Sequence, residues 1–316
     1  MIEILRPGLL TSVQDGGRVG YQAYGVPVCG AMDWVSLACA NILVDNPWDE
    51  AALEITGMGP SIRFEKDIVF SLAGADFSAT LNGQSIKNNS ACLAHEGDLL
   101  EMGAAQKGFR AYLAVAGGFD IPKVMESRST CLSAGFGGFE GRALRKGDRI
   151  GFRAPQLWLR NLPERHCIGF YDAGAPVPVV LGPQQDVFSQ EGIERFFDSE
   201  YRLSNQCDRM GCRLEGAAIE LKEGKNPNIL SDGIVMGSIQ VPNGQPIVMM
   251  ADRQTTGGYA KLGTVPSCAL PLMGQKRPGD SVRFQQVTVS EAQAMRKRLI
   301  RKLKNLEREL NFAGRW

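Results

Sequence analysis

Frequent glycine limits how this sequence can fold more than any other feature does. Glycine accounts for 37 of the 316 residues, whereas about 7% is average for globular proteins. The glycines separate short apolar runs that match the length of strands better than that of helices. Because glycine also adopts the left-handed backbone of tight turns, we expect a mostly β fold with a few helices.

Short apolar runs bounded by turn residues predict the strands. A helix is predicted over 35–44, because Asp33 can cap its start and a turn-forming Asp-Asn-Pro segment follows it. A second helix is predicted near 190–198, where apolar side chains share one face. The predicted strands are 2–5, 68–72, 77–81, 99–102, 111–115, 177–181, 229–230, 239–241 and 247–251.

The segment 154–176 predicts a connector between two domains, because it holds three prolines and no sustained periodicity. The sequences GPSIRF at 59–64 and GDSVRF at 279–284 resemble each other, which favours two related β-barrels. The predicted order is a first β domain over 1–153, the connector over 154–176, a second β domain over 177–289 and a C-terminal helix over 290–316.

The predicted C-terminal helix is amphipathic and basic. Ser290 is the expected N-cap, and a stripe of apolar residues follows at 295, 299, 303, 306 and 310. Between 296 and 308 there are seven basic residues and one acid, Glu307. The pattern favours a helix packed on its own barrel with a solvated basic face. The alternative is a contact helix for an acidic partner or a membrane surface.

Composition excludes several classes of function. Lys plus Arg number 35 and Asp plus Glu number 34, a net charge of +1, so nucleic acid is not the expected partner. The longest apolar stretch is far shorter than the ~20 residues that span a bilayer. Glu3 and Pro7 interrupt the position of an export signal. Eight scattered cysteines without a Cys-x-x-Cys pair then favour reduced thiols and a cytoplasmic location.

Histidine and nucleotide motifs are informative because they are scarce. The sequence has only His95 and His166, which predicts no metal site and argues against a histidine-based hydrolase. No Walker-type phosphate loop occurs, and the glycine-rich run 135–141 lacks the spacing of a dinucleotide fingerprint. No Met-Lys dipeptide occurs either, so any biotin would arrive on another chain.

The densest polar cluster follows the apolar strand that ends near residue 250. A strand that ends in polar side chains and two glycines is a common way to present a site. Asp252 could act as a base or pair with a cation, whereas the hydroxyl and amide groups could bind substrate oxygens. A plain tight turn explains the same residues equally well. The candidate catalytic residues are Asp252, Gln254, Thr255, Thr256 and Tyr259.

Other polar clusters are candidates for binding a substrate or a phosphate. Arg209 suits bidentate binding of a carboxylate or phosphate, but a surface pair with Asp208 is at least as plausible. Gln240 faces away from its apolar neighbours on a strand, either into a barrel or to solvent. The candidate binding residues are Asp15, Arg18, Arg128, Ser129, Thr130, Asp208, Arg209 and Gln240.

Nine short motifs in register make the sequence resemble a known family. They are similar to the family of 5-oxoprolinase C subunits, also described as allophanate hydrolase subunit 2, the antagonist of a sporulation-kinase inhibitor, or the biotin-dependent carboxyltransferase family. The motifs are PGL at 7–9, VQDGGR at 13–18, GAMD at 30–33, AN at 40–41, YLAVAGG at 112–118, SRST at 127–130, DRMG at 208–211, IQVP at 239–242 and QTTGGY at 254–259.

The resemblance implies a fold and a function. It implies a pair of cyclophilin-like β-barrels that assemble with two partner proteins, the A and B subunits of the enzyme. That complex is a bacterial ATP-dependent 5-oxoprolinase, expected to use Mg with ATP, which opens 5-oxoproline to glutamate; the single chain is expected to be inactive alone. The basic C-terminal helix and the connector depart from the family's core pattern without touching the motifs.

Two other functions remain open at this stage. The chain could be a carboxyltransferase-type subunit of a urea-carboxylase-like system, with biotin on another chain. It could also be a non-catalytic antagonist of a kinase inhibitor. In the oxoprolinase interpretation, Arg209 or Arg128 would bind a carboxylate or phosphate. Gln254, Thr255 and Thr256 would bind transferring oxygens, and Asp252 or Asp15 would bind a cation or accept a proton.

Overall fold

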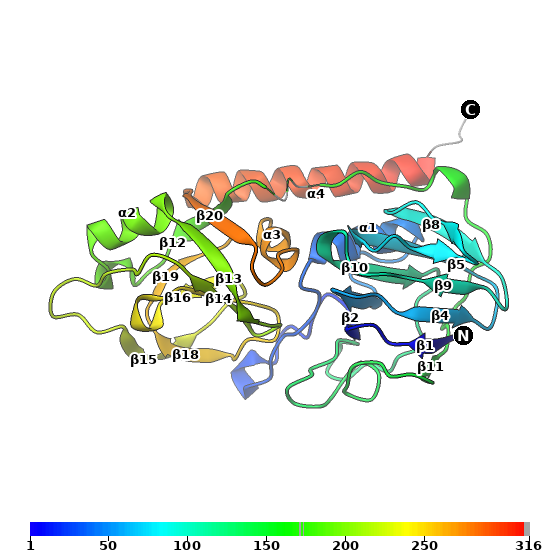
Figure 1. The fold of residues 1–316 in the computed structure, drawn as a ribbon, viewed down its shortest axis with the longest axis horizontal. Helices are drawn as coiled ribbons and strands as arrows, with labels where there is room; N and C mark the ends of the chain where they lie inside the picture. The colour runs from blue at the N-terminus through cyan, green and yellow to red at the C-terminus, as the bar shows by residue number, and fades with distance from the viewer. Residues whose placement is uncertain (171, 173, 313–316) are drawn as a thin grey trace. The chain divides into compact units, whose positions relative to one another are not determined.

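The fold is described from a computed structural model that covers residues 1–170, 172 and 174–312. The chain divides into two compact units (Figure 1). Unit 1 comprises residues 1–18, 29–171 and 300–316, and unit 2 comprises residues 19–28 and 172–299. The division between residues 171 and 172 lies inside the segment that the sequence predicts as a connector.

Unit 1 is built on two antiparallel sheets that share one apolar core. Alternate residues of β1 and β4 are buried, as a strand with one face on the core requires. The core draws side chains from both sheets, among them Ile4, Phe70 and Leu113. The first sheet has the order β11-β1-β4-β9-β6-β7 and the second β2-β3-β10-β5-β8. Their bounds are β1 Ile2–Arg6, β2 Leu10–Gln14, β3 Ala52–Thr56, β4 Ser61–Phe64, β5 Ile68–Asp76, β6 Thr80–Leu81, β7 Gln84–Ser85, β8 Ser90–Ala94, β9 Leu99–Glu101, β10 Lys107–Val115 and β11 Arg149–Ile150.

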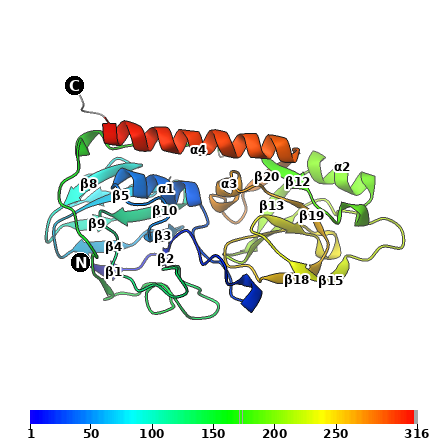
Figure 2. The same ribbon diagram turned by 180° about the vertical axis from the view of Figure 1, so that it is seen from behind.

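Helix α1, Trp34–Leu43, covers the outer face of the second sheet by packing on β5, β8 and β10 (Figure 2). Its predicted cap is confirmed, because the Asp33 carboxylate accepts hydrogen bonds from the backbone N–H groups of Val35 and Ser36 at 3.1 and 3.0 Å. Every residue from Val35 to Leu43 is buried. The helix therefore closes the side of the sheet that faces away from the core.

The glycine-rich run 135–141 is a loop, as predicted, and one glycine in it is sterically required. Gly138 has a φ of 53°, and a Cβ atom there would lie 1.9 Å from the Thr130 hydroxyl oxygen. Cys131 and Phe136 form an isolated β-bridge at the base of this loop. The glycine therefore lets the loop fold back tightly against the segment that contains Thr130.

Unit 2 is a closed seven-stranded barrel. Its strand order is β12-β19-β16-β17-β14-β13-β20, and a parallel pairing of β12 with β20 closes the ring. Two further strands, β15 Asn228–Gly233 and β18 Thr256–Tyr259, form a separate antiparallel ribbon. The barrel strands are β12 Val177–Leu181, β13 Glu200–Cys207, β14 Gly211–Glu215, β16 Ser238–Gln240, β17 Ile247–Met249, β19 Lys261–Thr264 and β20 Ser281–Gln286.

Two helices accompany the barrel of unit 2. The predicted helix α2, Gln190–Asp198, is confirmed, and it packs on β20 with the Phe196 ring stacked on Phe284 at a centroid distance of 4.6 Å. Helix α3, Leu270–Gly274, was not predicted, because five residues are too few to show a helical period. Four short 3-10 turns occur in the described chain, at Gln22–Tyr24, Leu162–Glu164, Gln185–Val187 and Pro242–Gly244.

The C-terminal helix is confirmed as α4, Val289–Phe312, with one correction at its start. The predicted residues 313–316 lie outside the described part of the chain. Ser290 lies inside the helix, and Thr288 is the cap. The Thr288 hydroxyl accepts the N–H of Glu291 at 3.2 Å, while the Glu291 carboxylate accepts the N–H of Thr288 at 2.7 Å. The predicted apolar stripe is buried at Leu299, Leu303, Leu306 and Leu310, whereas Met295 is 37% exposed.

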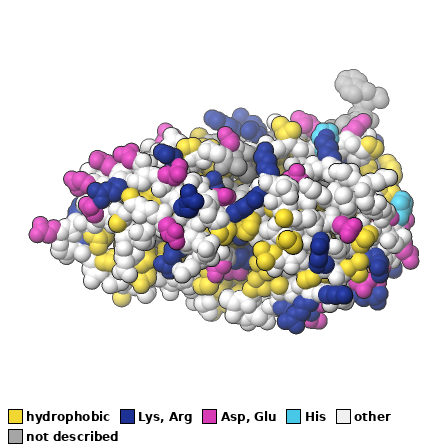
Figure 3. Space-filling view, in the orientation of Figure 1, with side chains coloured by type: hydrophobic (Ala, Val, Ile, Leu, Met, Phe, Trp, Pro, Cys, Tyr) yellow, Lys and Arg dark blue, Asp and Glu magenta, His cyan; other side chains and the backbone are white. Residues whose placement is uncertain are grey.

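The basic residues of α4 face away from its leucine stripe. All seven are exposed, and in Figure 3 basic side chains gather over the region of this helix. The mostly β fold with a C-terminal amphipathic helix is therefore confirmed. Among the described residues, no helix combines the length and apolar character needed to cross a membrane.

Candidate functional site

The residues that the sequence predicts as a site fall into two groups, one in each unit. In unit 1 the structure brings together Asp15, Arg18, Arg128, Ser129 and Thr130, although more than a hundred residues separate the two segments. In unit 2 the predicted residues lie around the ends of β13, β16, β17 and β18. They are Asp208, Arg209, Gln240, Asp252, Gln254, Thr255, Thr256 and Tyr259.

In unit 1, the Asp15 carboxylate is a buried hydrogen-bond acceptor with four donors. Its Oδ1 atom accepts from the Ser127 and Ser129 hydroxyls at 2.8 and 2.5 Å and from the Gly17 N–H at 2.8 Å. Its Oδ2 atom accepts from the Arg128 N–H at 2.5 Å. These bonds satisfy the carboxylate internally, so Asp15 ties the segment 127–129 to the end of β2.

Arg18 is fully buried beside Asp15 but does not contact that carboxylate. Its Nε atom donates to the Val124 carbonyl at 3.0 Å, and its Nη2 atom donates to the Ser129 carbonyl at 2.9 Å. The guanidinium carbon lies 4.7 Å from the centroid of the Phe136 ring. The Nη1 atom is buried without a hydrogen-bond partner among the described residues. Arg18 therefore holds the loop that follows β10.

Arg128 and Thr130 complete the unit 1 group. Arg128 donates from Nε to the Ile121 carbonyl at 2.8 Å and pairs with Glu50 at 3.5 Å. Arg153 pairs with the same Glu50 carboxylate at 2.7 Å. The Thr130 hydroxyl donates to the Val13 carbonyl at 2.9 Å. Each side chain is used in holding loops together, which favours a structural rather than a ligand-binding role.

In unit 2, Arg209 and Asp252 form a buried ion pair with two hydrogen bonds. Arg209 Nε lies 3.0 Å from Asp252 Oδ2, and Nη2 lies 2.8 Å from Oδ1. The backbone N–H of Asp252 also donates to the Arg209 carbonyl at 2.7 Å. The alternative of a surface pair between Asp208 and Arg209 is wrong. Asp208 instead accepts from the N–H groups of Met210 and Gly211 and closes its own turn.

Gln240 is a buried polar side chain that faces the β15–β18 ribbon. Its Nε2 atom donates to the Tyr259 carbonyl at 3.3 Å. A Cβ atom on Gly257 would lie 2.7 Å from that same nitrogen, so the Gln240 side chain closely approaches the backbone of β18. The sequence left two orientations for the Gln240 side chain, buried or facing solvent. The structure has the buried orientation, in which Gln240 contacts β18.

A buried lysine in this region was not among the predicted site residues. Lys261 is 6% exposed, and its Nζ atom donates to Asp232 Oδ2 at 2.7 Å and to the Gly233 carbonyl at 3.3 Å. Lys261 is also the strand partner of Gln240. The hydrogen bond from Lys261 holds the pKa of the Asp232 carboxyl below its ordinary value. The sequence feature that could have indicated this residue is a lysine that lies directly between the apolar residues Ala260 and Leu262.

The remaining predicted residues lie on the accessible segment 254–259, in which Gly257 and Thr256 are strand partners of the lysine-bound residues Asp232 and Gly233. Gln254, Thr256 and Tyr259 are exposed, and Thr255 is half-buried while its carbonyl accepts the Ile234 N–H. We call this group the ribbon site. It comprises Asp232, Gln240, Gln254, Thr255, Thr256, Tyr259 and Lys261. Beside the Asp232 carboxylate, which pairs with Lys261, the group offers one ammonium, two amides, two threonine hydroxyls and a phenol. These donors suit an anionic ligand with several oxygen atoms.

Unit 1 contains a second buried polar group that the sequence did not predict. The Tyr112 hydroxyl donates to Glu54 Oε2 at 2.7 Å and accepts the N–H of Asp33 at 2.9 Å. Glu54 also accepts the Met32 N–H at 2.9 Å. Burial, and then the Glu54 carboxylate, raise the pKa of Tyr112 well above its ordinary value. Tyr112 therefore stays protonated and bridges the start of α1 to β3.

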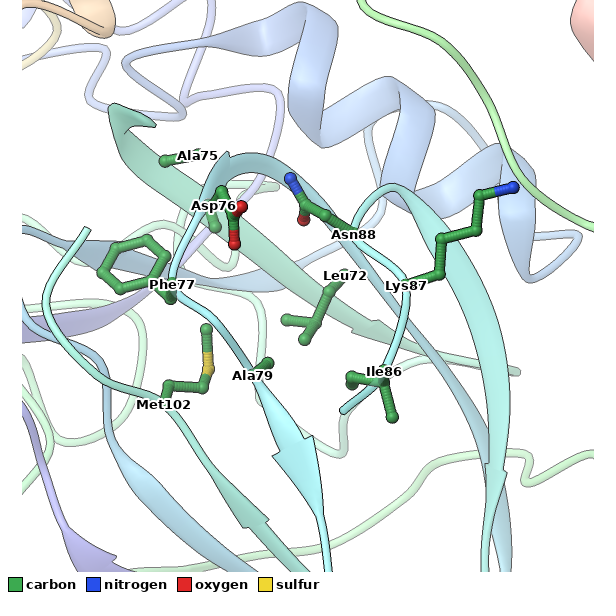
Figure 4. A pocket seen from close by; sticks show the side chains of 10 residues that line it. Leu72, Ala75, Asp76, Phe77, Ala79, Ile86, Lys87, Asn88 and Met102 are labelled. Atoms are coloured by element: carbon green, nitrogen blue, oxygen red, sulfur yellow. The ribbon is translucent and has the colours of Figure 1, made fainter. Parts of the chain in front are cut away.

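Two hollows in the structure lie away from the predicted residues. Figure 4 shows a cavity in unit 1 lined by Leu72, Phe77 and Met102 among others, with a volume of about 10 Å³. That volume accommodates one water molecule and no substrate. A larger hollow of about 200 Å³ in unit 2 is lined mainly by apolar groups, among them Val180, Pro266, Val289 and Ala292, and Arg296 also lines it.

Metal binding has no support from the residues described. Among 1–170, 172 and 174–312, no three His, Cys, Asp or Glu side chains are grouped so that they could hold a metal ion.

The chain belongs to the family of carboxyltransferase domains, subdomains A and B, which matches residues 24–286. It is similar to the C subunit of 5-oxoprolinase from Escherichia coli K12, with 39% identity over 92% of this chain and 93% of the relative. It is 33% identical to the corresponding 5-oxoprolinase protein of Haemophilus influenzae over 94% and 95% of the two chains.

A solved structure extends this similarity to three dimensions. The urea carboxylase of Kluyveromyces lactis superimposes with a TM-score of 0.89 at 31% identity, covering 96% of this chain and 29% of the larger enzyme. The family resemblance that the sequence motifs indicated is thus confirmed by the family match, by close relatives and by fold.

Proposed function

We propose that this chain is the C subunit of an ATP-dependent 5-oxoprolinase, which opens 5-oxoproline to glutamate together with the A and B subunits. The observation that carries the proposal is the 39% identity to the Escherichia coli protein over nearly the full length of both chains. The name of that relative supports a multi-subunit enzyme and hence partner chains. We place the complex in the cytoplasm, where the eight free cysteines would stay reduced.

The chemistry of this reaction fits the groups in the ribbon site. The lactam carbonyl is a poor electrophile, and phosphorylation of its oxygen makes the ring carbon open to attack. Catalysis of phosphoryl transfer depends mainly on positioning and charge stabilisation. ATP, with Mg, would be a co-substrate of the assembled complex. This chain would supply groups that bind and orient anionic oxygens.

Within the ribbon site, Lys261 is the residue best suited to bind the substrate carboxylate. Its aliphatic part is buried, while its partner Asp232 has a side chain 57% exposed to solvent. An anionic ligand can therefore replace Asp232 at the ammonium group without leaving a charge buried and unpaired. Gln254, Thr255 and Thr256 then offer hydrogen bonds to the remaining oxygens, and Tyr259 borders the same segment.

We assign Asp252 and Arg209 a supporting role rather than a catalytic one. The two side chains share two hydrogen bonds in a buried setting. Asp252 lies two residues before Gln254, where the accessible segment begins. Asp15, Arg18 and Arg128 play the same role in unit 1, where their hydrogen bonds hold loops. Their contribution to activity would therefore be indirect.

A carboxyltransferase-type function is the second candidate, favoured by the similarity to the Kluyveromyces lactis urea carboxylase. In that case biotin would arrive on another chain, and the ribbon site would bind the carboxyl acceptor. The same lysine and amide groups suit either an amide or a lactam ligand. The two proposals therefore differ in the partner chain and in the reaction, not in the residues used.

Reconstitution tests the proposed function. The chain is co-expressed with the A and B subunits encoded in the same genome, and phosphate and glutamate release are measured with and without 5-oxoproline. We expect 5-oxoproline to stimulate ATP hydrolysis, and glutamate to form only when all three chains are present. Glutamate formation without this chain, or turnover by this chain alone, would contradict the proposal. A silent complex would also contradict it, and transfer from a biotin carrier would then test the second candidate.

A further inference from the structure

The middle of the connector is anchored to helix α1 by one buried arginine. Arg165 is 1% exposed, and its guanidinium donates to the carbonyls of Leu43 and Ile42 at 2.7 and 3.1 Å. It also pairs with Asp45. These contacts satisfy the free carbonyls at the C-terminal end of α1 and place a positive charge there. The position of the connector against the helix is thereby fixed.

The connector continues from Arg165 as an extended strand-like segment beside β8. The Ala91 N–H donates to the Arg165 carbonyl, the Cys167 N–H donates to the Asn89 carbonyl, and His166 bridges to Ser90. Side chains of an extended segment alternate between faces. Accordingly Arg165 is buried, His166 is exposed and Cys167 is half-buried, so Arg165 and Cys167 both face α1.

Helix geometry places Cys167 next to Cys39. Cys39 precedes Leu43 by four residues, a step of about 6 Å along the helix axis. Cys167 follows Arg165 by two residues, a step of about 6.6 Å along an extended chain. With Arg165 held at Leu43, the two thiols come close enough to interact, with the Cys39 thiol as donor and the Cys167 sulfur as acceptor.

The contact differentiates the two thiols chemically. Burial raises the pKa of Cys39 well above its ordinary value, whereas the hydrogen bond from Cys39 lowers the pKa of Cys167. Cys167 is also the more accessible of the two. These are the properties of an attacking thiol beside a resolving thiol.

We propose that Cys39 and Cys167 form a reversible dithiol–disulfide site that takes a low-molecular-weight disulfide such as oxidised glutathione as its oxidant. The Cys167 thiolate attacks one glutathione sulfur, giving a mixed disulfide and releasing one glutathione thiolate, which takes up a proton. Cys39 then loses its proton and attacks the Cys167 sulfur, which releases the second glutathione as a thiolate that takes up this proton. Two protein thiols are oxidised, and one oxidised glutathione is reduced to two thiols.

Closure of this bond would link the connector covalently to α1 within unit 1. The two cysteines are 128 positions apart in the sequence, so the crosslink would restrict a long loop of the unfolded chain. The Arg165 contacts hold the connector reversibly, and the disulfide would make the same attachment permanent until reduction. The proposal is independent of the enzymatic function proposed above.

Redox titration of the full-length chain tests the site. The protein is equilibrated in glutathione buffers of graded potential, alkylated, digested without reduction and analysed by mass spectrometry. We expect a crosslink between the peptides that contain Cys39 and Cys167, reversed by dithiothreitol and absent from the Cys39→Ala and Cys167→Ala variants. The Cys92→Ala variant is the matched control, because Cys92 lies on β8 with comparable exposure and should leave the crosslink intact.

A second measurement keeps the proposal testable if a variant folds poorly. Iodoacetamide should alkylate Cys167 of the reduced wild-type chain several-fold faster than Cys92, whose pKa is raised by burial. Cys39→Ala should slow the alkylation of Cys167 several-fold and leave that of Cys92 unchanged. Failure to form the crosslink at any potential, or equal alkylation rates in wild type and Cys39→Ala, would overturn the proposal.

Discussion

Arg209 and Asp252 face each other inside unit 2 through two hydrogen bonds of 3.0 and 2.8 Å, with both side chains almost fully buried. The pair joins the turn between β13 and β14 to the end of β17. The polar segment that carries Gln254 and Thr256 begins two residues later. Its position therefore depends on an ion pair that the sequence places 43 residues apart.

Asp252→Ala should destabilise unit 2 strongly. The substitution removes the Asp252 carboxylate from the buried Arg209 guanidinium, and removal of one member of a buried pair costs about 3–5 kcal/mol. The midpoint of urea unfolding measures this change. Asp208→Ala, which affects only an exposed turn, is the control and should cost no more than about 1 kcal/mol. A well-folded Asp252→Ala variant without activity would instead make Asp252 catalytic.

Asp15→Ala should destabilise unit 1 by at least about 3 kcal/mol, because four buried or part-buried donors lose their acceptor at once. Asp120→Ala, an exposed carboxylate of the same unit, should change stability by less than about 0.5 kcal/mol. Urea unfolding followed by tryptophan fluorescence compares the two variants. Equal midpoints would contradict the structural role given to Asp15.

The Asp232 carboxyl should titrate below an ordinary aspartate because of its hydrogen bond to Lys261. A pKa depressed in the folded state stabilises the protein above the unfolded value of about 3.9 and loses that effect as pH falls through the folded value. Lys261→Met should therefore raise the pKa of Asp232, as followed by carbon NMR of the carboxyl group. Lys225→Met, at an exposed position, should leave the titration unchanged. A titration of Asp232 unaffected by Lys261→Met would refute the pairing.

Leu303→Ala should weaken the packing of α4. Leu303 is fully buried in the leucine stripe, and truncation of a buried leucine costs about 2–5 kcal/mol. Lys304→Ala, on the exposed basic face, should cost less than about 0.5 kcal/mol. Hydrogen exchange along α4 compares the two variants. Equal protection in both would indicate that the basic face, not the leucine stripe, holds the helix.

The elements that the sequence predicted well have local signals. The cap at Asp33 and the amphipathic face of α2 each depend on residues within a short stretch of the sequence, so local patterns are enough to predict them. The predicted start of α4 was wrong because two pairs of residues fit the spacing of a capping box. These pairs are Thr288 with Glu291 and Ser290 with Gln293. Only the fold decides between them, since it places the Glu291 carboxylate against the Thr288 backbone.

The candidate site was harder to predict because its contacts are long-range. The motif at 254–259 located the accessible segment, but nothing local distinguishes Asp252 as the partner of Arg209 rather than as a free carboxylate. Lys261 escaped notice because a lysine in an apolar strand is ordinarily read as an exposed position. Its burial follows from pairing with Gln240 and Asp232, which lie 21 and 29 positions earlier in the sequence.

The dependence of 5-oxoproline turnover on Lys261 tests the central claim most directly. In a complex assembled with the A and B subunits, kcat/KM for 5-oxoproline is compared between wild type, Lys261→Met and the control Lys225→Met. Loss of a charged hydrogen bond to the substrate predicts a 10- to 100-fold decrease, roughly, for Lys261→Met, mainly through KM. The control should match wild type. Unchanged kcat/KM in a fully assembled Lys261→Met complex would contradict the ribbon site as the place where this chain binds substrate.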